Sequence, residues 1–232
     1  MKRVAIVQSN YLPWRGYFDL IASVDEFVLY DDAQYTKRDW RNRNAIKTPQ
    51  GLLWLTVPVR SKGRFDQRVC ETEIDGTEWQ AAHWKSILQH YARASHVAAL
   101  RQALAPVFEG PPPAMLSELN RALIESVCGA LGITTRLSTS AGCALPEGRT
   151  AKLVELCRRA GAGTYVSGPA ARAYLDESEF AAAGIAVEWF GYEGYPEYPQ
   201  LWGPFEPKVS VVDLIANCGP RAPEFMKYVP RA

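Results

Sequence analysis

Hydrophobic and polar residues alternate at the start of the chain in a way that predicts a strand, a helix and a second strand. Arg3 to Val7 is a β-branched apolar run that ends in polar residues, as a buried parallel strand does. Tyr17 to Val24 has apolar residues at helical spacing, and Glu26 to Tyr30 reads as a second strand. The loop from Gln8 to Gly16 then lies at the carboxyl end of the first strand, where ligands bind in open α/β sheets.

The middle of the chain changes character. Between Asn44 and Ile74, apolar runs at Leu52 to Val59 and Val69 to Ile74 predict an antiparallel strand insertion after a turn at Thr48 to Gly51. A helical segment follows, broken at Gly110 by three prolines. Its predicted helices are about Glu78 to Ala94, Val97 to Phe108 and Ala114 to Leu131.

The last hundred residues return to alternating strands and helices, which indicates a parallel sheet continued from the N-terminal unit. The predicted strands are Thr134 to Thr139, Thr164 to Ser167 and Ile185 to Tyr192, and the predicted helices are Thr150 to Ala160, Pro169 to Ala183 and Val209 to Ala216. We therefore expect an α/β fold, a mainly parallel sheet flanked by helices, in a single domain over residues 1–232. Residues 44–131 either form an insertion lobe or cover the one sheet, and the pattern leaves both open.

Composition narrows the class of protein. The chain has 232 residues, of which 47% are hydrophobic and 22% charged, as in globular proteins. Its formal net charge of +1 lacks the basic excess of nucleic-acid-binding proteins, so we expect no nucleic-acid partner. No apolar run approaches the roughly 20 residues of a membrane span, and the N-terminal one is too short for a signal peptide. We expect a cytoplasmic protein without a membrane span. The sequence does not indicate its oligomeric state.

Metal and thiol chemistry have no motif in the sequence. The five cysteines include no Cys-x-x-Cys pair. His83 and His90 are seven residues apart, which is too far for the paired ligands that an i, i+4 spacing gives on a helix. We therefore assign no metal.

An unusual density of polar and aromatic residues lies between Gln8 and Asn44, directly against the two predicted N-terminal strands. Asp31 and Asp32 are candidate catalytic residues, since like-charge repulsion in a carboxylate pair raises one pKa, which suits a base. Adjacent residues on a strand point to opposite faces, so one of the two is expected to face the ligand.

The remaining candidates are binding residues, although each can also have a structural role. Arginine guanidinium groups fit phosphate oxygens in pairs, and free N–H groups at a helix start hold anions. The candidates for a phosphate-bearing cofactor are Arg38, Arg41, Arg43, Ser167 and Gly168. Amides can read sugar hydroxyls and aromatic rings can stack on a base or a pyranose. The substrate-binding candidates are Gln8, Asn10, Tyr11, Tyr17, Gln34, Tyr35, Trp40, Asn42 and Asn44.

Taken together, these residues resemble the WbqC-like family along essentially the whole chain. The resemblance rests on Gln8, Tyr11 to Pro13, Gly16 to Phe18, Tyr30 to Asp32, Gln34, Tyr35, Arg38, Trp40 and Asn42 to Asn44, and later on Lys152, Tyr165 to Gly168, Ser210, Asp213 and Asn217 to Gly219. The family is known mainly from bacterial surface-polysaccharide and O-antigen gene clusters. It implies a role in attaching glycine or another acyl group to an amino sugar, and it supplies no established catalytic residues.

The N-terminal unit is also laid out like the start of the nucleotidyltransferase-like fold. That fold places a His-x-Gly-His motif against nucleotide phosphates, and here the two histidine positions hold Trp14 and Tyr17. Without imidazoles, the usual stabilisation of the phosphoryl transition state is missing. The resemblance therefore implies the layout of that fold rather than its chemistry.

Three functions follow as hypotheses. The first is an N-acyltransferase or aminoacyltransferase, glycyl transfer included, that modifies a nucleotide-linked amino sugar in surface-polysaccharide (lipopolysaccharide O-antigen) biosynthesis. The second is an ATP-dependent carboxylate-amine ligase of nucleotidyltransferase-like ancestry. The third is a non-catalytic nucleotide-sugar-binding component. The sequence does not identify the cofactor, which can be acyl-CoA, another acyl thioester or ATP, nor the donor, the sugar or the nucleotide.

Overall fold

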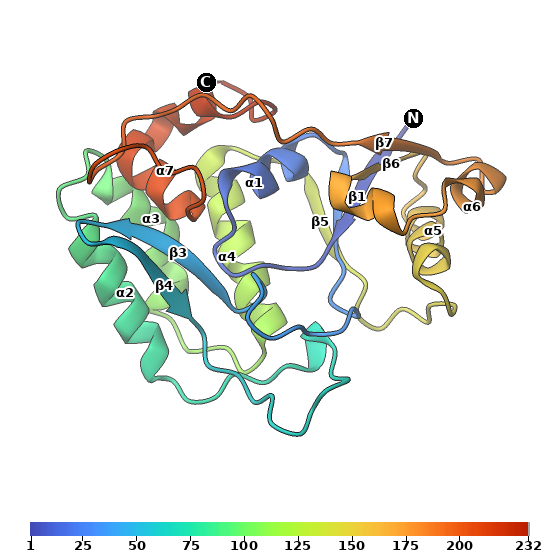
Figure 1. The fold of residues 1–232 in the computed structure, drawn as a ribbon, viewed down its shortest axis with the longest axis horizontal. Helices are drawn as coiled ribbons and strands as arrows, with labels where there is room; N and C mark the ends of the chain where they lie inside the picture. The colour runs from blue at the N-terminus through green and yellow to red at the C-terminus, as the bar shows by residue number, and fades with distance from the viewer. Residues whose placement is uncertain (232) are drawn as a thin grey trace.

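A computed structural model describes residues 1–231 and has an α/β architecture around a five-stranded parallel sheet (Figure 1). The strands follow the order β5-β2-β1-β6-β7, and every neighbouring pair is parallel. Their bounds are Arg3–Val7 for β1, Glu26–Leu29 for β2, Arg136–Thr139 for β5, Thr164–Ser167 for β6 and Ala186–Trp189 for β7. The predicted fold class, a mainly parallel sheet flanked by helices with a separate antiparallel pair, is confirmed.

The strand order reverses beside β1. From β1, the chain passes through α1 (Arg15–Ala22) to β2 on one side. After β5, it passes through α5 (Arg149–Arg159) to β6 on the other side of β1, and then through α6 (Glu177–Ala182) outward to β7. The connections therefore leave β1 and β6 in opposite directions, which opens a crevice at the carboxyl ends of these strands.

Alternate residues of the central strands pack against helices on opposite faces of the sheet. Val4 and Ile6 belong to an apolar cluster that includes Cys157 of α5 and Phe180 of α6. Ala5 belongs to the larger core on the other face, which α1, α4 (Leu116–Leu131) and α7 (Val211–Cys218) help to fill. The near-continuous burial of β1 and β2 follows from this double cover.

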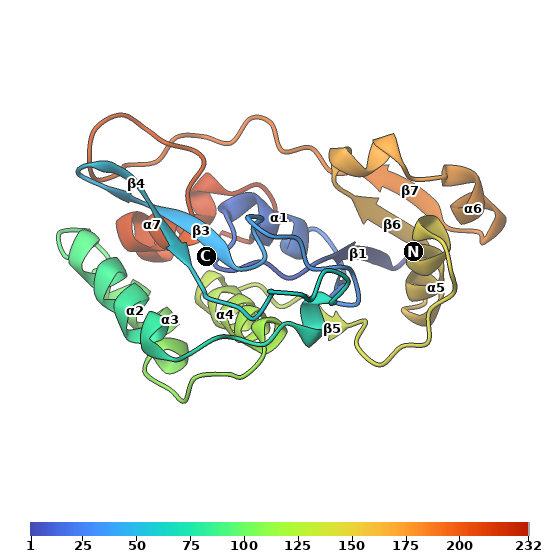
Figure 2. The ribbon, with the colours of Figure 1, turned by 60° about the horizontal axis from the view of Figure 1, so that its bottom comes forward.

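The middle of the chain adds an antiparallel ribbon and two helices. The ribbon pairs β3 (Arg43–Thr48) with β4 (Gly51–Thr56), and the helices are α2 (Glu78–His90) and α3 (Val97–Phe108). Figures 1 and 2 show α2, α3, α4 and α7 at one end of the molecule and α5 and α6 at the other. Apolar residues from α2, α3, α4 and the ribbon share one core with α1, β2 and α7.

Two predicted elements are wrong. Val69 to Ile74, predicted as a strand, contains a 3-10 helix at Val69–Glu71 and isolated bridges, because its backbone bonds to irregular segments: the Val69 N–H donates to the Ala33 carbonyl. The predicted helix over Pro169 to Ala183 is divided into a 3-10 helix, Pro169–Ala173, and α6. The division lies at Asp176, whose side chain accepts from the Ser178 N–H and begins a new helix.

The segment between β7 and α7, residues 190–210, has no regular secondary structure. Hydrogen bonds from its middle part, between Tyr198 and Trp202, hold it against the rest of the protein. The Tyr198 hydroxyl donates to Asp213 Oδ1 at 2.8 Å, Lys47 Nζ donates to Gln200 Oε1 at 2.8 Å, and Trp202 Nε1 donates to the His90 carbonyl at 3.2 Å. These bonds fix the segment against the ribbon, α2 and α7.

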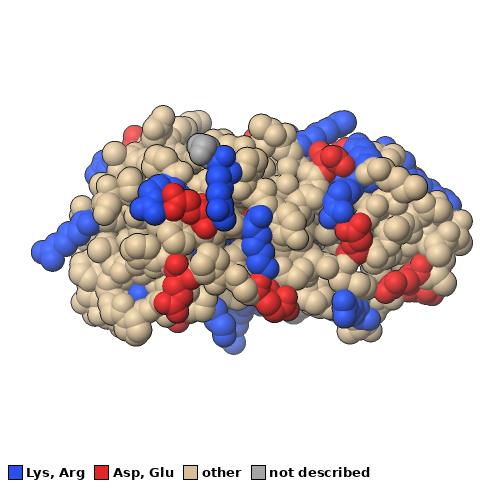
Figure 3. Space-filling model, turned by 90° about the horizontal axis from the view of Figure 1, so that it is seen from above, with Lys and Arg blue, Asp and Glu red and all other residues tan. Residues whose placement is uncertain are grey.

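The surface mixes charges of both signs. On the face shown in Figure 3, basic and acidic side chains are interspersed among neutral ones rather than gathered into a continuous basic area. Within residues 1–231, no helix combines the length and the apolar character needed to cross a membrane.

Candidate functional site

A cleft of about 760 Å³ lies at the carboxyl ends of β1, β2 and β6, where the strand order reverses. Its floor is the apolar end of β1, and its walls come from the loop after β2, the start of α5 and the turn after β6. Its charged lining consists of the cations Arg41, Arg149 and Lys152 and the carboxylate of Asp32. The remaining polar and aromatic side chains of the lining are Gln8, Gln34, Thr36, Ser167, Tyr30, Tyr165, Tyr174 and Tyr192. Position and lining make it the candidate site.

The cations of the cleft come from two distant parts of the chain. Arg149 and Lys152 lie three residues apart in the first turn of α5 and therefore project from the same side of the helix. Arg41 approaches from the loop after β2, and one of its terminal nitrogens donates to Asn10 Oδ1. Burial lowers the pKa of Arg41 from its ordinary value. Three cations against one carboxylate make the cleft suited to an anionic ligand such as a phosphate.

Asp32 is fixed in the cleft wall with one oxygen uncommitted. Its Oδ1 accepts from Arg68 Nη1 at 2.8 Å, and Arg68 is itself held by Glu71 at 2.6 Å. Oδ2 of Asp32 is buried and has no hydrogen-bond partner within the described chain. An ionised carboxylate oxygen can only accept, so this oxygen is an unpaired acceptor in the wall of the cleft.

Asp31 lies behind the wall. Its side chain is buried, Oδ1 accepts from the Ser9 N–H at 2.8 Å, and it does not line the cleft. Burial raises the pKa of Asp31, and the bond from Ser9 partly offsets that rise. Of the two neighbouring carboxylates, Asp32 thus reaches the cleft and Asp31 fixes the loop that follows β1.

A buried amide on α4 connects these loops. Asn120 donates to Ser9 Oγ at 3.1 Å and to the Arg41 carbonyl at 2.9 Å. The Tyr17 hydroxyl of α1 donates to the Gln8 carbonyl at 3.1 Å. The backbone next to Gln8 and Arg41 is therefore held in place by side chains from two helices, α1 and α4.

The predicted site residues separate into two groups. Those that line the cleft are Gln8, Asp32, Gln34, Arg41, Ser167 and Gly168, and those outside its lining are Asn10, Tyr11, Tyr17, Asp31, Tyr35, Arg38, Trp40, Asn42, Arg43 and Asn44. Several of the second group have backbone-binding roles: Asn42 donates to the Val57 carbonyl and Asn44 to the Leu12 carbonyl, each at 2.8 Å. Arg38 and Trp40 are exposed on the loop that leads from the cleft to β3.

Sequence reasoning missed part of the lining. Arg149, Thr36, Tyr174 and Tyr192 line the cleft without having been candidates, and Tyr30, Lys152 and Tyr165 entered only through the family resemblance. The available signal was the first turn of a helix that follows a predicted parallel strand, because such a turn lies at the carboxyl edge of the sheet. Tyr192 lies near the start of the irregular segment after β7 and packs on Trp14, with ring centroids 5.4 Å apart.

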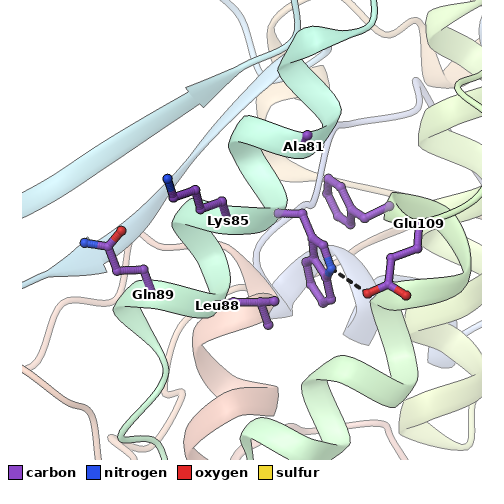
Figure 4. A pocket seen from close by; sticks show the side chains of 7 residues that line it. Ala81, Lys85, Leu88, Gln89 and Glu109 are labelled. Atoms are coloured by element: carbon purple, nitrogen blue, oxygen red, sulfur yellow. Dashed lines mark hydrogen bonds between the residues drawn. The ribbon is translucent and has the colours of Figure 1, made fainter.

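A second hollow lies beside α2 and the end of α3 and has a different character (Figure 4). It is a wide surface depression of about 680 Å³, and its charged side chains are Lys85 and Glu109. Trp84 Nε1 donates to Glu109 Oε1 at 2.9 Å, which commits that oxygen to the wall. Its lining has fewer convergent polar groups than the cleft, so we place the site in the cleft.

Comparison with known proteins confirms the family resemblance. The model of the WbqC-like protein family matches residues 8–225, a range that contains the cleft lining except for Ile6 and Val7. An uncharacterized protein of Mycobacterium tuberculosis is 56% identical over 228 residues, which cover 98% of this chain and 99% of that protein. No solved structure gives a significant match. The chain belongs to the WbqC-like protein family.

Proposed function

We propose that this chain is an N-acyltransferase or aminoacyltransferase that binds a nucleotide-linked amino sugar in the cleft and forms an amide on the sugar nitrogen, as a step in bacterial surface-polysaccharide biosynthesis. The observation that supports this most is the cleft itself, which sets the uncommitted Oδ2 of Asp32 in a lining with three cations. The family resemblance supplies the class of reaction.

In this proposal the cations bind the diphosphate. Arg149 and Lys152 are on one helical turn and Arg41 comes from another loop, so phosphate oxygens are met from two sides. The tyrosines of the lining give a flat surface for the base or the sugar ring. The sugar hydroxyls meet Gln8, Gln34 and Ser167.

The proposed chemistry uses Asp32 as the base. A sugar ammonium group that donates to Oδ2 is oriented by it and gives up a proton to it, and the free amine attacks the carbonyl carbon of the donor. The carbon–nitrogen bond forms, the bond from the acyl carbon to the leaving group breaks, and the leaving thiolate or alkoxide takes the proton that the nitrogen loses as the amide forms. Arg68, which holds the other oxygen of Asp32, fixes the direction of the carboxylate.

Mass spectrometry of the protein with a panel of nucleotide-linked amino sugars, with acyl-CoA donors or with glycine and ATP, tests the proposal. Asp32→Asn is expected to lower the rate by about 100-fold or more, as removal of a general base does. Lys152→Ala is expected to raise the KM for the sugar nucleotide by about tenfold through a lost phosphate contact. Arg158→Ala, on the exposed side of the same helix, and Asp66→Asn, an exposed carboxylate, are matched controls that should retain activity.

The cation set also suits a triphosphate, which keeps ATP-dependent ligation as a second candidate. That enzyme would activate a carboxylate by adenylation and release pyrophosphate before the amine attacks. Pyrophosphate formed in step with amide would establish ligation, whereas amide from acyl-CoA without pyrophosphate would establish acyl transfer. Binding of the sugar nucleotide without product under every donor, and full activity in Asp32→Asn, would each contradict the transferase proposal.

A further inference from the structure

Two tryptophans lie together on the protein surface outside the cleft. Trp54 is on the outer face of β4, and Trp40 is on the loop that leads into β3. Their ring centroids are 5.6 Å apart and their planes are inclined by 33°. Each is more than two-fifths exposed, at 45% for Trp40 and 42% for Trp54. Figure 2 shows the β3–β4 ribbon at the surface, at the end of the molecule that holds α2 and α3. We refer to Trp40 and Trp54 as the tryptophan platform.

The platform is held by the backbone. Trp54 pairs with Ala45 in the antiparallel ladder. The Trp40 carbonyl accepts from the Tyr11 N–H at 3.0 Å, and the Trp40 N–H donates to Asp39 Oδ1 at 2.7 Å. Large rings that are already ordered lose little conformational entropy on binding, which is why such rings serve as anchors in recognition surfaces.

Positive charge surrounds the platform. The Arg43 guanidinium lies 4.0 Å from the centroid of the Trp54 ring, and Lys37 and Arg38 are exposed on the loop that carries Trp40. The carboxylate in this stretch, Asp39, is committed to the Thr36 hydroxyl and the Trp40 N–H. A ligand at the platform therefore meets aromatic faces beside a cationic rim.

The platform lies next to a residue of the cleft in the sequence. Arg41 lines the cleft and directly follows Trp40 in the chain. The bond from Tyr11 to Trp40 ties the platform loop to the segment after β1.

We propose that Trp40, Trp54 and Arg43 form a carbohydrate-binding subsite for an anionic glycan. Indole faces pack against the C–H face of a pyranose, and arginine binds the carboxylate or phosphate that an acidic sugar carries. The choice of a glycan rests on the proposed function of the cleft. A second copy of this chain is a poorer occupant, because a two-fold contact would bring the cationic rims of both copies against each other.

Isothermal titration with tetrasaccharides of glucuronic, galacturonic and mannuronic acid tests the subsite, with carboxyl-reduced forms of the same tetrasaccharides as neutral controls. We expect saturable binding of at least one acidic tetrasaccharide. Trp40→Ala and Trp54→Ala should each weaken it by about tenfold through the lost stacking, and Arg43→Gln should abolish the preference for the acidic form. Circular dichroism of each variant verifies that it is folded.

Phe65→Ala is the matched control, since Phe65 is an exposed aromatic residue with Lys37 5.7 Å from its ring centroid but belongs to no ring pair in the described chain. It should leave binding unchanged. The proposal is overturned if no acidic tetrasaccharide binds, if Phe65→Ala weakens binding as much as the tryptophan variants do, or if light scattering finds a dimer that Trp54→Ala dissociates. The titrations contain no acyl donor, so a failure of acyl transfer does not change their result.

Discussion

Replacement of Asn120 by alanine should lower the free energy of unfolding, because it removes two hydrogen bonds. Asn120 is fully buried in α4, and its amide nitrogen donates to Ser9 Oγ and to the Arg41 carbonyl. Alanine removes both donors at once. Ser9 in turn supports Asp31, so the change acts where the loops after β1 and β2 meet.

The expected loss follows from the two bonds. Each intramolecular hydrogen bond contributes about 1 kcal/mol net, and an acceptor left unpaired in a buried position costs about 1 kcal/mol more. Alanine also removes Asn120 Oδ1, a buried acceptor without a partner in the described chain, which offsets part of this loss. The free energy of unfolding should therefore fall by about 1–3 kcal/mol. With a urea slope of about 3 kcal/mol/M, the unfolding midpoint should fall by about 0.3–1 M.

Urea unfolding followed by far-ultraviolet circular dichroism and by tryptophan fluorescence measures the change, and coincident curves verify two-state behaviour. Asn120→Leu keeps most of the side-chain volume but no donor, so it should lose a similar amount if the bonds rather than the packing are responsible. Glu125→Ala is the control on the same helix: its exposed ion pair with Arg121 should contribute no more than about 0.5 kcal/mol.

A loss below about 0.5 kcal/mol in Asn120→Ala, with an unchanged urea slope, would refute the reasoning, because it would mean that the loops hold their positions without this amide. Full stability in Asn120→Leu alone would refute the assignment to hydrogen bonding and leave packing as the cause.

Other predictions concern the loss of stability at acid pH through His83 and the substitution of two glycines. Burial lowers the pKa of His83 to about 4. The unfolded chain, with its histidine near pKa 6.5, then binds the proton first, so stability falls as the pH drops from 7 to 4, by up to about 3 kcal/mol. His83→Gln should lack this part of the loss in urea titrations at pH 7 and 4.5, and equal losses in both proteins would contradict it. A Cβ at Gly16 would lie 2.3 Å from the Trp14 ring, whereas one at Gly129 meets nothing within 4 Å. Gly16→Ala should therefore lower the free energy of unfolding, measured by thermal denaturation, by about 1–3 kcal/mol through overpacking. Gly129→Ala should raise it by up to about 1 kcal/mol. Stabilisation by both substitutions would contradict the prediction for Gly16.

The sheet could be predicted from the sequence because its strands are short apolar runs bounded by polar residues. The β-branched run at Arg3 to Val7 and the alternation after Thr134 are local signals, and both gave strands close to the observed bounds. Val69 to Ile74 has the same local composition but adopts a 3-10 turn, because its backbone partners are the loop at Ala33 and the start of α4. Backbone hydrogen-bond partners that lie far along the chain do not affect the local pattern of apolar and polar residues.

Part of the candidate site could also be predicted from local sequence, because several of its residues directly follow predicted strands. Gln8, Asp32 and Arg41 follow β1 and β2, and the rule that ligands bind at the carboxyl ends of parallel strands places them in the cleft. Arg149 belongs to a helix more than a hundred residues later, and the strand order that brings it there is a property of the whole sheet. Asn42, Arg43 and Asn44 come after Arg41, where the chain leaves the lining of the cleft and enters the ribbon.

The pairing of β1 with β6 has a consequence for how the protein is made. Arg3 is synthesised well before Thr164, with which it pairs, whereas the other neighbour of β1, β2, follows within a short stretch. A nascent chain therefore carries Gln8, Asp32 and Arg41 long before the opposite wall of the cleft has been synthesised. Closing so long a loop slows folding and leaves one edge of β1 unpaired in the meantime. The lining of the cleft is complete only after the chain has been synthesised as far as Tyr192.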